Sequence, residues 1–70
     1  MMVEVFKTNI QRKRTAAKVR MELLLLFPEC KINFDLDDCD RILRIESAVE
    51  VGKRIEEEMS RKGFHCEELL

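Results

Sequence analysis

The stretch "KINFDLDDCDRILRIES" (residues 31–47) decides the fold. Apolar and polar residues alternate at 31–36 and again at 41–47, which is the period of a strand with one buried face. The apolar positions of the two segments are Ile32, Phe34, Leu36, Leu43 and Ile45. The four residues 37–40 between them suit a short loop, because aspartate can hydrogen-bond its own backbone. This stretch therefore predicts an antiparallel hairpin.

A helix is predicted before the hairpin. At about 100° per residue, one face of this segment carries Ala16, Val19, Leu23, Leu26 and Phe27. Thr8 and Gln11 have the spacing of a capping box near its start. Pro28 should end the helix, because the residue before a proline is pushed out of the helical region.

A second helix is predicted after the hairpin. Its apolar face consists of Ala48, Val51, Ile55 and Met59. Ser47 and Glu50 have the spacing of another capping box, directly after the strand. Gly63 should follow the last turn, where a left-handed backbone costs glycine little.

Two further strands complete the pattern, one at 2–10 and a short one within "FHCEELL" (64–70). We expect Phe6 and Ile42 on the outer face of the sheet. The order of elements predicts an α+β fold, a ferredoxin-like βαββα(β) two-layer sandwich with two helices on one face of an antiparallel sheet. Residues 1–70 are predicted to form one domain.

Charge and cysteine content narrow the function. The net charge is −1, but residues 1–31 hold seven Lys/Arg and three Glu, whereas 32–70 hold six Lys/Arg and eleven Asp/Glu. Such a dipolar domain suits contacts with a partner. Three cysteines without a C-x-x-C motif, and no amino-terminal apolar stretch of signal-peptide type, predict a reduced, cytoplasmic chain. The apolar run "LLLLF" (23–27) is too short to span a membrane, so we expect no membrane association.

The chain resembles the heavy-metal-associated (HMA) domain family of copper chaperones and metal-transporting ATPases over nearly its whole length. The resemblance rests on the order of elements, on Val19 and Leu23, on the hairpin "INFDL" and "RILRI", and on "GFHCEEL" (63–69). It implies the ferredoxin-like fold. The family binds metal through Met-x-Cys-x-x-Cys, and counting back from Val19 places these ligands at Ile10, Arg12 and Thr15. Because no thiolate stands there, we expect neither a metal site nor a cofactor.

Two other kinds of site can be weighed from the sequence. Cys39, Cys66 and His65 are the remaining ligands for a transition metal, but neighbouring residues of an extended segment point to opposite faces. The basic first helix could meet nucleic acid, yet the chain has no Trp or Tyr for base stacking. Metal and nucleic acid are therefore the less favoured alternatives. A single histidine and the absence of a glycine-rich phosphate loop predict a non-catalytic protein.

Apolar residues opposite the core face of the first helix point to a contact surface. The predicted interaction surface combines these with a basic cluster and consists of Arg12, Lys13, Arg14, Met21, Leu24 and Leu25. A slightly rotated helix would bury Leu24 instead. The sequence thus predicts an HMA-like domain without a metal site, which binds an unknown protein partner or forms a homodimer.

Overall fold

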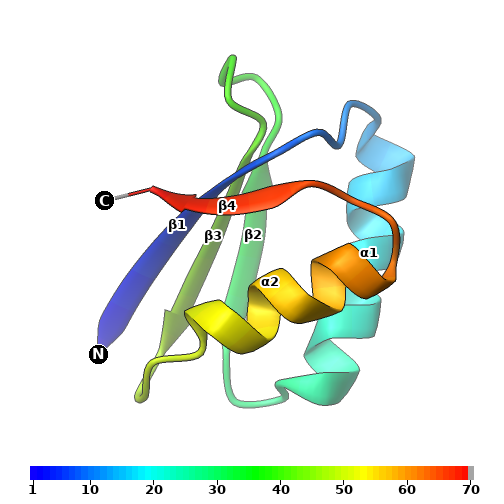
Figure 1. Ribbon diagram of the computed structural model, residues 1–70. Helices are drawn as coiled ribbons and strands as arrows, with labels where there is room; N and C mark the ends of the chain where they lie inside the picture. The colour runs from blue at the N-terminus through cyan, green and yellow to red at the C-terminus, as the bar shows by residue number, and fades with distance from the viewer. Residues whose placement is uncertain (70) are drawn as a thin grey trace.

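The computed structural model describes residues 1–69. Within this range the elements follow the predicted order: β1 (Met2–Thr8), α1 (Lys13–Leu26), β2 (Lys31–Asp35), β3 (Ile42–Ser47), α2 (Gly52–Arg61) and β4 (Cys66–Leu69). The strands form one antiparallel sheet in the order β2-β3-β1-β4, and α1 and α2 cover one of its faces (Figure 1). The predicted α+β two-layer sandwich is confirmed.

The register of the central strands determines which residues face the helices. Phe6 in β1 lies opposite Leu43 in β3, and both side chains are completely buried beneath the helices. The expectation that Phe6 lies on the outer face was therefore wrong. The polar residues of this strand did not reveal its inner face, because Glu4 is buried on the same side as Phe6. Ile42 is half-buried.

One hydrophobic core lies between the sheet and the helices. The buried apolar side chains are Phe6, Ile10, Ala16, Val19, Leu23, Phe27, Ile32, Leu43, Ile45, Val51, Ile55 and Met59. Two predicted core residues are exposed. Leu26 is 48% exposed at the last position of α1, and Ala48 is exposed because α2 begins only at Gly52, beyond the connecting turn.

Neither predicted capping box forms. The residue before α1 is Arg12 and the residue before α2 is Val51, and neither side chain caps its helix. The Thr8 hydroxyl donates instead to the carbonyl oxygen of Arg41, at 2.6 Å, and the Ser47 hydroxyl donates to the carbonyl oxygen of Val49. Both helices begin several residues after their strands, so these hydroxyls hold connecting turns.

The carboxyl end of α2 agrees with the prediction. Gly63 has φ 89°, in the left-handed region, and its amide donates to the carbonyl oxygen of Ser60 at 2.9 Å. The chain then reverses, so that β4 pairs with β1 and Cys66 lies opposite Thr8.

Candidate functional site

The first candidate surface is the basic start of α1. Arg12, Lys13 and Arg14 are all exposed, and none of them takes part in an ion pair within residues 1–69. The first turn of α1 contains no acidic residue. Three positive charges next to the positive end of a helix dipole are locally unfavourable. This part of the surface would therefore gain from contact with a negatively charged group.

An apolar stripe follows on the outer face of the same helix. We use the name outer stripe for Ala17, Met21 and Leu25, which are spaced by four residues and are all exposed. Met21 is 67% exposed and Leu25 is 84% exposed. Leu24, by contrast, is partly buried and packs against the core. Met21 and Leu25 are thus exposed as predicted, whereas Leu24 follows the stated alternative of a slightly rotated helix that buries it.

Exposed apolar surface continues beyond the end of α1. Leu26 and Val49, the latter 64% exposed, line a cavity of about 210 Å³ where α1 ends and α2 begins. The Arg54 guanidinium lies 4.7 Å from the ring centroid of Phe27 at this end of the molecule. This end of the molecule thus carries exposed apolar side chains in addition to the outer stripe.

A cleft separates α1 from the edge strand β2. It has a volume of about 390 Å³, with Lys13, Ala17 and Arg20 on the helix side and Phe34 and Asp35 on the strand side. The Nε of Arg20 donates to the carbonyl oxygen of Ile32 across it, at 2.7 Å. Sequence reasoning missed this cleft. No local pattern signalled it, because the cleft depends on where α1 lies over the sheet.

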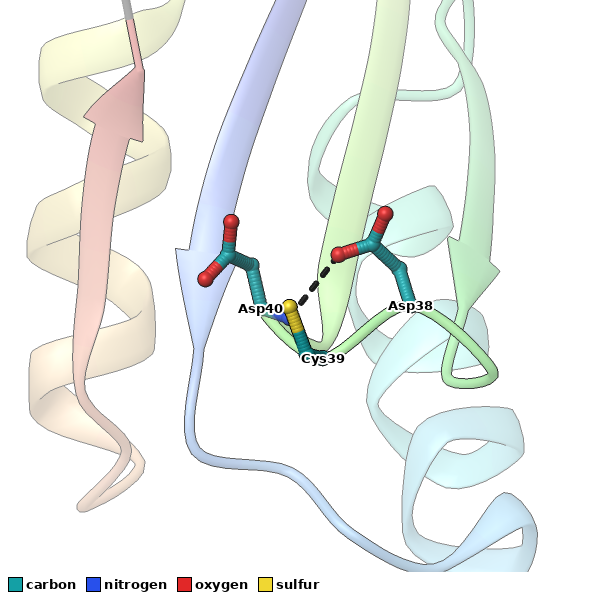
Figure 2. A group of neighbouring side chains, drawn as sticks. All are labelled: Asp38, Cys39 and Asp40. Carbon is teal, nitrogen blue, oxygen red and sulfur yellow. Dashed lines mark hydrogen bonds between the residues drawn. The ribbon is translucent and has the colours of Figure 1, made fainter.

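The remaining metal ligands of the sequence analysis do not come together. Among residues 1–69, one group of three metal-ligating side chains lies within 4.8 Å, namely Asp38, Cys39 and Asp40, without Cys66 or His65 (Figure 2). Asp38 Oδ1 accepts a hydrogen bond from the Asp40 amide at 2.8 Å, which is the bond expected of aspartate in a tight turn. The hairpin loop therefore accounts for this cluster without a metal.

The thiols differ in their surroundings. Cys39 is exposed at the hairpin tip. Cys66 is partly buried, and burial, aided by the charges of Glu56 and Glu68, raises the pKa of its thiol to about 12. Burial also raises the pKa of Cys30. Cys66 is thus a partly buried thiol that packs against the core.

An acidic group lies at the start of α2. The Glu4 side chain is 5% exposed, its Oε1 accepts a hydrogen bond from the Val51 amide at 3.2 Å, and its Oε2 has no partner in the described chain. Glu68 lies close by, and a side chain at Gly52 would collide with its carboxylate. Loss of water contact, then the charges of Glu4 and Glu56, raise the pKa of Glu68. Glu4 is therefore explained by its contact with the start of α2.

Aromatic residues offer no stacking platform for bases. Phe6 and Phe27 are buried, while Phe34 and Phe64 are partly buried against the core. Single-stranded nucleic acid is bound chiefly by exposed aromatic and basic groups together. The basic cluster stands without such aromatics in the described part of the chain.

Comparisons of the chain with protein-family models, with curated proteins and with solved structures returned no match. Neither α1 nor α2, the helices of residues 1–69, has the length and apolar character needed to cross a membrane. The exposed surface of α1 and the cleft between α1 and β2 remain the candidate functional features of the described chain.

Proposed function

We propose that this chain is an HMA-like domain without the family's metal site, and that it acts as a non-catalytic module for protein interaction or self-association. The observation that carries the proposal is the exposure of Met21 and Leu25 on one face of α1, 67% and 84% respectively. Two large apolar side chains one turn apart lose unfavourable contact with water when a partner covers them.

The charge around the outer stripe supports an oriented contact. Arg14 precedes Ala17 by less than one turn, and Lys18 follows it, so basic groups flank the amino-terminal half of the stripe. Apolar contact would supply affinity, and the positive charges would select a partner face with acidic groups. Acidic residues are plentiful in the second half of this chain, which makes self-association one form of the role.

The proposed location is the cytoplasm. Cys30, Cys39 and Cys66 are all free thiols, and Cys39 is exposed. An exposed free thiol is stable in a reducing compartment and is readily oxidised outside it.

Sedimentation of the reduced protein over a concentration series tests the proposal. The wild type is expected to self-associate, and the double variant Met21→Glu/Leu25→Glu should weaken association about tenfold or more, because it places charge in an apolar contact. Val3→Glu is the matched control. Val3 is 54% exposed in β1, away from α1, so its substitution should leave association unchanged. The new Glu lies opposite Glu46, so a small loss of stability is expected.

Two results would contradict the role of the outer stripe. One is a double variant that associates as strongly as the wild type. The other is an equal loss of association in Val3→Glu, which would show that the effect is unspecific.

A further inference from the structure

The edge strand β2 presents backbone groups on its outer side that bond to no other strand. β2 is the outermost strand of the sheet beside β3, and α1 lies next to it (Figure 1). The Thr8 amide bonds towards β3, so the even-numbered residues of β1 bond β3 and, through the register of the sheet, the odd-numbered residues of β2 bond β3. The Ile32 carbonyl oxygen therefore points away from β3, and Arg20 Nε donates to it there. In an antiparallel ladder the outward-pointing groups belong to alternate residues. The amides and carbonyls of Ile32 and Phe34 therefore face away from the sheet.

The sequence of β2 is complementary to itself when two copies run antiparallel. A two-fold axis at Asn33 brings Lys31 opposite Asp35 of the second copy, and the reverse pair forms on the other side. Ile32 then lies opposite Phe34 of the second copy, and these residues exchange their outward hydrogen bonds. Both charged pairs are attractive, and both lie on the exposed outer face of the sheet.

The opposite edge of the sheet lacks this complementarity. An antiparallel pair of β4 strands centred in the same way would set Glu67 against Glu68 of the second copy twice. Like charges directly opposite each other destabilise a strand pair. Self-pairing is therefore favoured at β2 and opposed at β4.

The helix beside β2 contributes a second layer to the same contact. Ala17 lines the cleft towards β2, and Met21 and Leu24 lie within about 60° of it around the helix axis. Joining two sheets through β2 places the two α1 helices next to each other on one face. The side of α1 that carries Ala17 and Met21 then faces its counterpart.

We propose that the partner of this module is a second copy of the same chain, docked through β2 so that the two sheets form one continuous eight-stranded antiparallel sheet. This inference rests on the proposed interaction role and names the partner. The Arg20 bond does not block it, since a carbonyl oxygen has two lone pairs and can accept from Arg20 and from Phe34 of the second copy together.

Charge exchange at the ends of β2 tests this register. In the Lys31→Asp dimer, both pairs between position 31 of one copy and position 35 of the other consist of two acidic residues. In the Asp35→Lys dimer, both pairs consist of two basic residues. Each single variant should raise the dimer dissociation constant about tenfold or more, because two attractive pairs become repulsive. Lys31→Asp/Asp35→Lys should dimerise like the wild type, and an equimolar mixture of the two single variants should form a heterodimer. Both residues are exposed, so the variants should fold. Lys31→Asp faces Glu46 within the sheet and Asp35→Lys removes the acceptor of the Asp37 amide, so thermal unfolding measures the stability lost by each.

The outcomes separate this inference from the proposed function. Single charge variants that dimerise as strongly as the wild type overturn pairing through β2. If Met21→Glu/Leu25→Glu nevertheless associates more weakly than the wild type, the proposed interaction role of the outer stripe stands. Failure of the double exchange and of the mixture to restore the dimer also overturns the register. A wild type that stays monomeric at every concentration overturns the inference and the self-association form of the role together. An open-ended series of larger assemblies also overturns it, because a two-fold contact closes at two copies.

Discussion

The carboxylate of Glu4 in β1 accepts a hydrogen bond from the backbone amide of Val51 at the start of α2, with 3.2 Å between the two atoms. These residues are 47 positions apart in the chain. A buried acid from the sheet thus supplies the cap that the residue preceding α2 does not provide. The contact ties the second helix to the central strand.

Replacement of Glu4 should separate its role as a hydrogen-bond acceptor from its charge. Glu4→Ala should lower the free energy of unfolding by about 1 kcal/mol, because the Val51 amide loses its acceptor. Glu4→Gln should lose much less, since an amide oxygen can still accept this bond. Chemical denaturation measures both. Equal destabilisation by the two variants would show that charge, and not the hydrogen bond, holds the start of α2.

The hydroxyl of Thr8 is expected to matter for stability although it caps no helix. It donates to the Arg41 carbonyl oxygen at 2.6 Å and accepts from the Ile10 amide at 3.2 Å. Thr8→Val keeps the shape but leaves both groups without this partner, and should cost about 2 kcal/mol of unfolding free energy. Thr15→Val, at a half-buried position on α1, is the control and should have little effect. An unchanged free energy of unfolding in Thr8→Val would rule out this contribution.

Stability should respond to pH through Glu68. Its pKa is raised in the folded chain by lost water contact and by the charges of Glu4, Glu56 and Glu50. The folded state therefore binds more protons than the unfolded state between the two pKa values, and stability falls as pH rises through that window. Glu68→Gln removes this effect. The variant should gain thermal stability over the wild type at about pH 7.5 and no advantage at about pH 4. A difference that is the same at both pH values would exclude this origin.

Thiol labelling should proceed in a defined order. Cys39 is exposed, whereas burial raises the pKa of Cys66 to about 12, so that its reactive thiolate is scarce near pH 8. Alkylation followed by peptide mass spectrometry should show Cys39 modified about a hundredfold faster or more. Unfolded protein is the control, in which the rates should converge. Equal rates in the folded protein would contradict the burial of Cys66.

Sequence reasoning predicted the elements well because each is encoded locally. The alternation around Ile32 and Leu43 defined the hairpin, Pro28 and Gly63 followed the two helices, and Val19 and Leu23 marked the buried side of α1. The capping boxes failed for a local reason as well. Their spacing assumed helices starting directly after the strands, and the connecting turns are longer.

The candidate surface was predicted only in part. The exposure of Met21 and Leu25 follows from the helical period. The sequence of a single helix does not show how far the helix is rotated about its axis against the sheet. Leu26 was therefore predicted to be buried and Leu24 to be exposed, and the structure shows the reverse. The cleft beside β2 requires the position of α1 over the sheet. No local pattern contains that information.

The amino-acid sequence by itself determined the order of strands and helices, the apolar face of the hairpin and the unequal distribution of charge, because these depend on residues close together in the chain. Only the tertiary structure decided that Glu4 lies beneath α2, that Phe6 faces inward and that β2 is an edge strand. The physical reason is that the order of the strands within the sheet and the rotation of each helix about its axis result from contacts between residues far apart in the chain. Those contacts leave the Lys31 to Asp35 strand with backbone groups on its outer side that bond to no other strand.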